Sequence, residues 1–120
     1  MKIKLQSFGR KYGVPEAEIV LDVRCLENPF WVSELKPLSG LDAPVRDYIF
    51  SNAASLDFAQ KAAELLRAYA SLFEARNCEE VRFAIGCTGG RHRSVAVTEF
   101  LAKALENYEV EVDHRDIGRG

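Results

Sequence analysis

The stretch from Gly86 to Ser94, which reads GCTGGRHRS, holds the residues best suited to chemistry. An apolar run at 81–85 precedes it, and a helical pattern that begins near Val95 follows it. A strand, a short glycine-rich turn and a helix N-terminus in that order direct several free amide groups at one spot. The pattern therefore predicts an anion-binding site at this turn.

Two known kinds of phosphate loop can be compared with the spacing in the turn. A Walker A loop needs G-x-x-x-x-G-K-[ST], but the fifth residue after Gly86 is Arg91 and no lysine follows it. Cys87 and Arg93, in contrast, enclose five residues and precede Ser94, as in cysteine-dependent phosphatases. In those enzymes a thiolate attacks phosphorus while the arginine and the loop amides hold the phosphate oxygens. The spacing excludes Walker-type chemistry and is compatible with a phosphatase that uses Cys87 and Arg93.

The same geometry can also bind an anion without catalysis. Gly89 and Gly90 let the backbone approach a ligand closely. The Thr88 hydroxyl can donate a hydrogen bond, and Arg93 offers a planar fork for two phosphate oxygens. A phosphatase would further need a general acid, and the chain has no W-P-D-like loop to supply one. We therefore favour a non-catalytic site and keep the cysteine phosphatase as the alternative.

A second pair of charged residues extends the candidate site. Asp22 and Arg24 come just after the apolar run 19–21, and ligands of α/β sheets bind at the carboxyl ends of strands. Asp22 would contact the hydroxyls or the amine of a sugar. The candidate ligand-binding residues are Asp22, Arg24, Cys87, Thr88, Gly89, Gly90, Arg91, His92, Arg93 and Ser94.

The composition is that of an ordinary soluble domain. The 120 residues are 48% hydrophobic and 28% charged, and no apolar run approaches the length of a membrane span, so we expect a cytoplasmic protein. Cys25, Cys78 and Cys87 have no paired spacing, so we expect reduced thiols, no structural metal and no cofactor. The net charge of -2 gives no domain-wide positive field.

The hydrophobic periodicity predicts one α/β domain over residues 1–120, with helices packed on a mixed sheet of about four strands. Residues 19–21 form a short apolar run typical of a central strand. Residues 25–42 form a long loop, which we expect to be functional, and residues 118–120 a frayed tail. The expected strands are 2–8, 19–21, 81–85 and 108–112. The expected helices start at an Asp42 cap, near Ser55 and at Val95, and the second ends near Asn77.

RNA binding is a further hypothesis, which requires a local basic cluster because the whole chain is slightly acidic. Such a cluster would form if the turn's Arg91 folded beside the basic residues of the two ends of the chain. The candidate RNA-binding residues are Lys2, Lys4, Arg10, Lys11 and Arg115.

Several short motifs in a fixed order resemble one known family, the C-terminal domain of RapZ proteins, which are RNase adapters. The likeness runs from about Ser7 to Asp116 and includes Gly86–Gly90 with His92–Ser94. The other matching segments are Ser7–Gly9, Lys11–Gly13, Asp22–Arg24, Asn28–Pro29, Pro37–Asp42 and His114–Asp116. The N-terminal kinase-like domain that usually accompanies this domain is expected to be absent from this chain.

The resemblance implies a domain that binds glucosamine 6-phosphate, contacts a small RNA, presents it to an RNase and forms a homo-oligomer such as a dimer. It also implies a sugar-phosphate pocket at the positions of Asp22, Cys87, Thr88, Gly89 and Arg93. The partners expected from this likeness are therefore a small phosphorylated metabolite, an RNA and an RNase, with no membrane.

Overall fold

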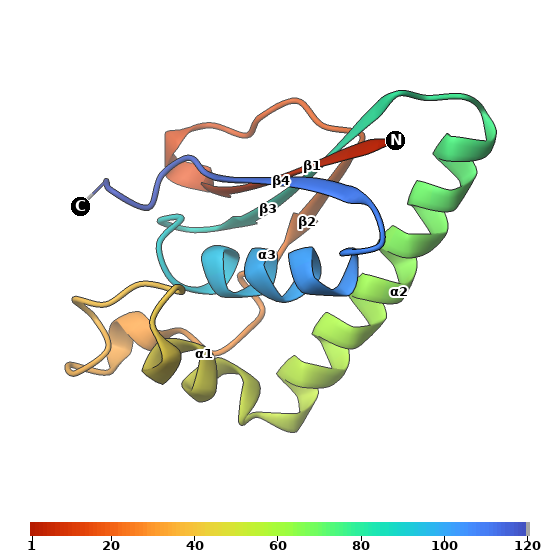
Figure 1. The fold of residues 1–120 in the computed structure, drawn as a ribbon. Coiled ribbons are helices and arrows are strands. Elements are labelled where there is room, and N and C mark those ends of the chain that lie inside the picture. The colour runs from red at the N-terminus through yellow and green to blue at the C-terminus, as the bar shows by residue number, and fades with distance from the viewer. Residues whose placement is uncertain (120) are drawn as a thin grey trace.

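Four strands form one sheet in the computed structural model, which describes residues 1–119. They are β1 (Lys2–Gly9), β2 (Ile19–Asp22), β3 (Glu80–Cys87) and β4 (Glu109–His114), in the spatial order β2-β3-β1-β4 (Figure 1). The predicted α/β domain with about four strands is confirmed. The expected mixed sheet is corrected in one respect, since every neighbouring pair of strands is parallel. After each strand the chain returns to the edge of the sheet at which that strand began, so that all strands run in the same direction.

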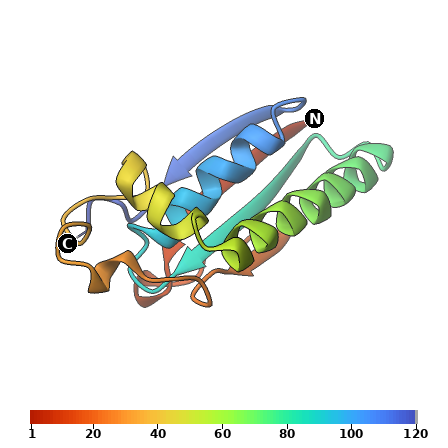
Figure 2. The same cartoon turned by 90° about the horizontal axis from the view of Figure 1, so that it is seen from below.

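Three helices cover one face of this sheet (Figures 1 and 2): α1 (Ala43–Phe50), α2 (Ala53–Ala75) and α3 (Arg93–Ala104). The Asn52 side chain caps α2 by accepting a hydrogen bond from the Ser55 amide at 3.1 Å. Asp42 does precede α1, but its carboxylate accepts from the Ser39 amide at 2.8 Å and does not cap the helix. Two short 3-10 turns, Arg10–Tyr12 and Pro29–Trp31, lie in the loops at the carboxyl edge of the sheet.

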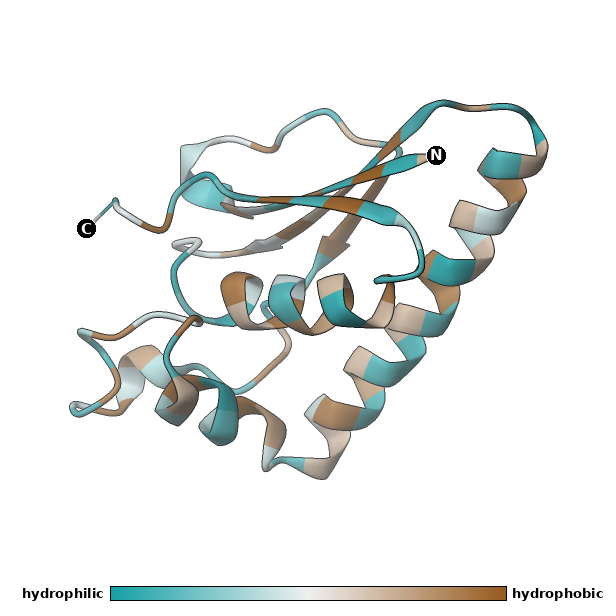
Figure 3. Cartoon of the chain, viewed as in Figure 1, coloured by the Kyte–Doolittle hydropathy of each residue, from teal (hydrophilic) through white to brown (hydrophobic). Residues whose placement is uncertain are grey.

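The core lies between the sheet and these helices. Alternate residues of β1 and β3, among them Ile3, Leu5, Val81 and Phe83, are at most 1% exposed and belong to the core. Figure 3 shows how hydrophobic and hydrophilic residues alternate along the strands.

The helical spacing of the apolar residues between Phe58 and Phe73 predicts a buried stripe on α2. This prediction is only partly right, because Leu65 and Leu72 of that stripe are 48% and 67% exposed. The small residues Ala59, Ala63 and Ala70 lie against the core instead, so the helix packs closely. The main core side chains are Ile3, Leu5, Val81, Phe83, Ile85, Leu66, Val97 and Leu101.

The strand order corrects the expectation that residues 19–21 are a central strand. β2 pairs only with β3 and therefore forms an edge, where Val20 is 40% exposed. A short apolar run fits a half-covered edge strand as well as a central one, so the sequence pattern could not distinguish them. What matters for the site is the shared direction of the strands, which brings Gly9, Asp22, Cys87 and His114 to one edge.

The face of the sheet opposite the helices is charged. Lys2 and Lys4 of β1 lie 3.3 and 3.9 Å from Glu111 of β4, and Lys4 also lies 3.4 Å from Glu80 of β3. Parallel sheets usually have helices on both faces. Here the second face is exposed to water and carries these ion pairs instead. None of the helices in residues 1–119 combines the length and apolarity needed to cross a bilayer.

Candidate functional site

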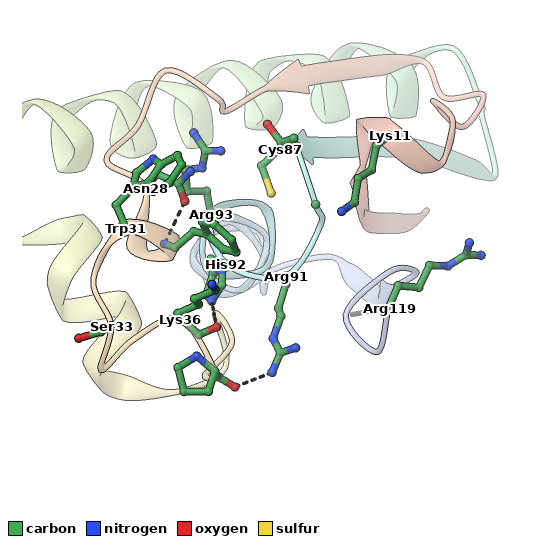
Figure 4. A pocket seen from close by; sticks show the side chains of 14 residues that line it. Lys11, Asn28, Trp31, Ser33, Lys36, Cys87, Arg91, His92, Arg93 and Arg119 are labelled. Carbon is green, nitrogen blue, oxygen red and sulfur yellow. Dashed lines mark hydrogen bonds between the residues drawn. The ribbon is translucent and has the colours of Figure 1, made fainter.

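A pocket of about 640 Å³ opens at the carboxyl edge of the sheet, around the Gly86–Ser94 turn (Figure 4). Its size is that of a small-molecule site. Four segments line it: the turn, the loop at 25–42 and the two chain stretches that follow β1 and β4. The lining residues are Lys11, Asn28, Phe30, Trp31, Ser33, Lys36, Pro37, Cys87, Thr88, Gly89, Arg91, His92, Arg93 and Arg119.

The lining is strongly positive although the chain as a whole is acidic. Five of the chain's 16 lysines and arginines line the pocket, whereas none of its 18 aspartates and glutamates does. A concave site with one sign of charge attracts ligands of the opposite sign. The lining of the pocket therefore carries a net positive charge.

The turn contributes backbone donors to this pocket. α3 begins at Arg93 without any side chain that caps its first amides. Within residues 1–119, the amides of Gly89, Arg91 and His92 also donate to no other protein group. Free amides at a helix N-terminus form an anion site because they carry the positive end of the helix dipole. The turn thus has the donors that the sequence predicted.

Glycine is required at the centre of the turn. Gly90 has a φ of 78°, and a Cβ there would lie 2.5 Å from the amide nitrogen of Gly9. The turn therefore packs directly on the end of β1, where a side chain would force it away. This close packing sets the position of the free amides relative to the edge of the sheet.

Cys87 lies at the base of the turn and is only 3% exposed. Its Sγ accepts a hydrogen bond from the Gly90 amide at 3.3 Å and lies 3.1 Å from the Ser94 hydroxyl. No carboxylate among the residues that line the pocket could serve as the general acid of a phosphatase.

Three consecutive side chains of the turn, those of Arg91, His92 and Arg93, contact backbone carbonyl oxygens of the neighbouring segment 24–38. Arg91 donates from Nε to the Leu38 carbonyl at 3.1 Å and also contacts the Pro37 carbonyl. His92 Nε2 lies 3.2 Å from the Lys36 carbonyl oxygen. Burial lowers the pKa of His92 below its ordinary 6.5, and backbone carbonyls of the loop only partly oppose this. A neutral His92 therefore fastens the loop by donating to it.

Arg93 has both a structural and a ligand-facing position. Its guanidinium is 6% exposed and donates to the carbonyl of Arg24 at 2.7 Å and to that of Leu26 at 3.4 Å. The residue also lines the pocket, so its remaining donors can meet a ligand. Sequence reasoning predicted the second role of Arg93 but not the first.

The structure does not bring Asp22 and Arg24 into the lining of this pocket. The two side chains form a forked pair, with Arg24 nitrogens 2.6 to 3.0 Å from the Asp22 carboxylate oxygens. The side-chain hydrogen bond from Arg24 is the main cause that lowers the pKa of Asp22 to about 2. Their strand ends beside the turn as expected, but the carboxylate is occupied by its neighbour.

Arg119 and Lys36 are pocket cations that the sequence did not predict. Arg119 belongs to the expected tail at 118–120, of which Gly120 lies outside the described residues. Its amide donates to the Asp116 carbonyl at 3.1 Å, and its guanidinium lies 3.1 Å from the Asp116 carboxylate and 4.7 Å from the centre of the Tyr12 ring. No local pattern marks these residues, because only packing brings them to the pocket.

Asp116 is a buried carboxylate that hydrogen-bonds to residues at the ends of β1 and β4. It accepts from the Gly9 amide at 2.7 Å and from Arg115 at 2.8 Å, and it is fully shielded from solvent. Burial would raise the pKa of Asp116, but the hydrogen bonds from Arg115 and Gly9 outweigh it, so this pKa is lowered. Asp116 thus joins the ends of β1 and β4 as an ionised group.

The candidate RNA-binding residues do not form one patch. Lys2 and Lys4 lie on the charged face of the sheet and are paired with glutamates. Lys11 lines the pocket, and Arg115 donates to the Gly13 carbonyl at 2.6 Å beside it. Arg10 begins the short 3-10 turn of that same segment. The basic surface that remains is centred on the pocket.

The protein is thus a small α/β domain with a positively charged pocket where a strand, a glycine turn and a helix N-terminus meet. The chain belongs to the RapZ C-terminal domain family, whose model matches residues 1–118. This confirms the family resemblance inferred from the motifs.

Curated relatives carry the name "Nucleotide-binding protein". The protein of Carboxydothermus hydrogenoformans is 47% identical over 120 residues, which is 98% of this chain and 42% of the relative. The protein of Lactiplantibacillus plantarum is 47% identical over 117 residues, covering 96% of this chain and 40% of the relative. The protein of Thermobifida fusca is 44% identical, covering 99% and 42%. The chain thus spans about two-fifths of the length of these relatives.

Proposed function

We propose that this domain captures a small phosphorylated metabolite, of the type of glucosamine 6-phosphate, without converting it. The observation that carries the proposal is the pocket with five cationic side chains, free turn amides and no carboxylate in its lining. The phosphate would rest on the amides of the turn, with Lys11, Arg93 and Arg119 around it. Membership of the RapZ C-terminal domain family supports the choice of an amino-sugar phosphate as the first ligand to test.

The amine of such a sugar has no carboxylate partner in the pocket. Asp22, which we expected to contact it, is paired with Arg24 outside the lining. Binding should therefore depend on the phosphate far more than on the amine. Calorimetry with glucosamine 6-phosphate, glucose 6-phosphate and glucosamine tests this: the two phosphates should bind similarly and glucosamine should not bind measurably.

Lys11→Ala is the sharpest variant for this test. Lys11 is exposed and lines the pocket, so its loss should weaken binding of glucosamine 6-phosphate about five- to ten-fold by removing one charge contact. Lys61→Ala is the matched control, because Lys61 lies on α2 and pairs with Asp57 at 2.7 Å. Equal binding by wild type and Lys11→Ala, or no binding by either, would contradict the proposal.

A cysteine phosphatase is the second candidate, and the hydrogen bond that the Gly90 amide donates to the Cys87 sulfur favours it. Its reaction would transfer a phosphoryl group to Sγ and then to water. We expect no turnover of p-nitrophenyl phosphate, since the thiol is buried and a lining acid is missing. Turnover that Cys87→Ser abolishes, with ligand binding retained, would replace the binding proposal with the enzyme.

RNA is the macromolecular partner that the basic surface around the pocket supports, as an adapter role would require. Lys11, Arg115 and Arg119 come together there from two distant segments. RNA binding should weaken steeply with salt and be reduced in Lys11→Ala but not in Lys2→Ala. A fluorescence-anisotropy titration with a short single-stranded RNA measures both effects, and equal loss in the two variants would argue against this surface.

A further inference from the structure

One wall of the pocket is aromatic. Phe30 and Trp31 both line it, with ring centres 5.3 Å apart and an interplanar angle of 83°. Trp31 is 79% exposed and Phe30 42% exposed. Large aromatic side chains usually bury most of their surface, so two of them left open beside an anion site call for a ligand that covers them.

The loop that presents these rings is held firmly. His92 and Arg91 bond the carbonyls of Lys36 and Leu38, and the Gly40 amide donates to the Arg91 carbonyl at 2.9 Å. The Asn28 side chain accepts from the Phe30 amide at 3.1 Å and so starts the 3-10 turn that carries both rings. The aromatic wall is therefore tied to the same turn that would hold the phosphate.

The two rings differ in their surroundings. The Lys36 ammonium lies 4.5 Å from the centre of the Phe30 ring, so Phe30 already has a cationic neighbour. Trp31 meets Phe30 only edge to face and leaves its own surface to solvent. The open stacking surface of the pocket is thus the indole of Trp31.

The polar side chains of the lining suit a flat group better than a second sugar ring. Besides the cations and Cys87, the polar side chains of the lining are those of Asn28, Ser33, Thr88 and His92, and no carboxylate is among the lining residues. A hexose presents several hydroxyls, each of which loses water on binding and needs a partner. A nucleobase can instead gain from stacking on an aromatic ring through its whole face.

We propose that the pocket also binds phosphorylated sugars that carry a base, namely nucleoside 5′-monophosphates, with the phosphate on the Gly86–Ser94 turn and the base stacked on Trp31. This inference rests on the proposed phosphate site and adds the group at the other end of the ligand. Adenosine 5′-monophosphate and ribose 5-phosphate form a matched pair of probes, because they share sugar and phosphate and differ in the base.

The test is calorimetry of both probes on wild type, Trp31→Ala and Trp31→Phe. Wild type should bind adenosine 5′-monophosphate about ten-fold or more tightly than ribose 5-phosphate, as stacking on one aromatic ring predicts. Trp31→Ala should lose this difference and keep its affinity for ribose 5-phosphate, while Trp31→Phe should retain most of it. Leu72→Ala on α2 is the control for loss of an exposed apolar side chain. Trp31 is the only tryptophan, so quenching of its fluorescence by the nucleotide reports stacking directly.

Each result decides the proposal. Equal affinity for the two probes in wild type overturns the base-stacking site, and binding of glucosamine 6-phosphate in the same protein would leave the proposed function intact. A preference for the nucleotide that survives in Trp31→Ala overturns the assignment to Trp31. Failure of all three phosphates to bind refutes the phosphate site itself.

Discussion

The open face of the sheet and the pocket at its carboxyl edge both carry lysines and arginines, but in different surroundings. On the sheet, Lys2 and Lys4 lie within 3.9 Å of Glu111, and Arg82 lies 3.5 Å from Glu80. In the pocket, five cations gather without one lining carboxylate. The sheet cations have glutamate neighbours, whereas within residues 1–119 four of the five pocket cations have no carboxylate within salt-bridge distance and only Arg119 is paired, with Asp116.

The difference shows why a net charge of -2 says little about ligands. The pocket holds five of the 16 lysines and arginines, so the remaining 11 are outnumbered by the 18 aspartates and glutamates outside it. The following predictions use paired variants from the two regions, so that each can break or sharpen the contrast between balanced and unbalanced charge.

The largest effect is expected for Arg93→Ala. Its loss would leave the carbonyls of Arg24 and Leu26 without their buried donor and would remove a cation from the pocket. We expect the free energy of unfolding to fall by about 1–3 kcal/mol and binding of glucosamine 6-phosphate to be lost. Urea denaturation and calorimetry measure the two effects. Arg82→Ala on the sheet is the matched variant, and an equal loss of stability there would erase the contrast.

A double-mutant cycle between Asp116 and Arg119 should give the next largest effect. Asp116→Asn keeps the shape but removes the charge that holds Arg119 at 3.1 Å. If Asp116 acts by positioning Arg119, each single variant should weaken phosphate binding several-fold, and the double variant should be no weaker than Arg119→Ala. Independent, additive losses measured by calorimetry would show that the two residues are not coupled.

Asp116 also predicts acid sensitivity. Its pKa is lowered in the folded state, so its ionisation stabilises the fold above the ordinary value of 3.8 and this stability is lost as pH falls through the lower, folded pKa. Wild type should therefore lose stability more steeply than Asp116→Asn below about pH 4. Thermal melting from pH 6 to pH 3 compares the slopes, and parallel curves would argue against an ionised Asp116.

A smaller effect near neutral pH is expected from His92. Because burial lowers its pKa, the unfolded chain takes up a proton below about 6.5 that the folded chain does not, so stability falls as pH drops from 7 to 5. His92→Gln should reduce this slope, since glutamine can still donate to the loop but does not titrate. His114→Gln is the control, and an unchanged slope in His92→Gln would contradict the prediction.

The smallest effect is expected for Lys4→Ala. This lysine has two glutamate neighbours and lies on the charged face of the sheet, so its loss should leave phosphate affinity unchanged and the melting temperature within experimental error. A clear loss of phosphate affinity in Lys4→Ala would show that the sheet face contributes to the ligand site after all.

Local patterns were sufficient to predict the elements that make the turn. The alternation of residues 2–8 predicted β1, the apolar run at 81–85 predicted β3, and Asp42 followed by Pro44 predicted the start of α1. The elements that depend on neighbours were harder to predict. β2 was expected in the centre of the sheet and lies at its edge, and Leu65 and Leu72 were expected in the core and are exposed.

The residues of the pocket also differ in whether a local sequence pattern predicts them. Cys87, Thr88, Gly89 and Arg93 could be found because a strand, a glycine turn and a helix start are contiguous in the chain. Lys36, Trp31 and Arg119 could not, because they reach the pocket only through the packing of long loops. Asp22 was placed at the right edge, yet its pairing with Arg24 keeps it out of the lining.

The amino-acid sequence by itself thus determined the turn and the helix N-terminus that we propose as the anion site, since those backbone donors belong to consecutive residues. Only the tertiary structure decided which cations line the pocket and that an exposed tryptophan shares it. The physical reason is the range of the interactions: backbone donors are arranged by local geometry, whereas charge balance depends on which distant side chains the strand order brings together.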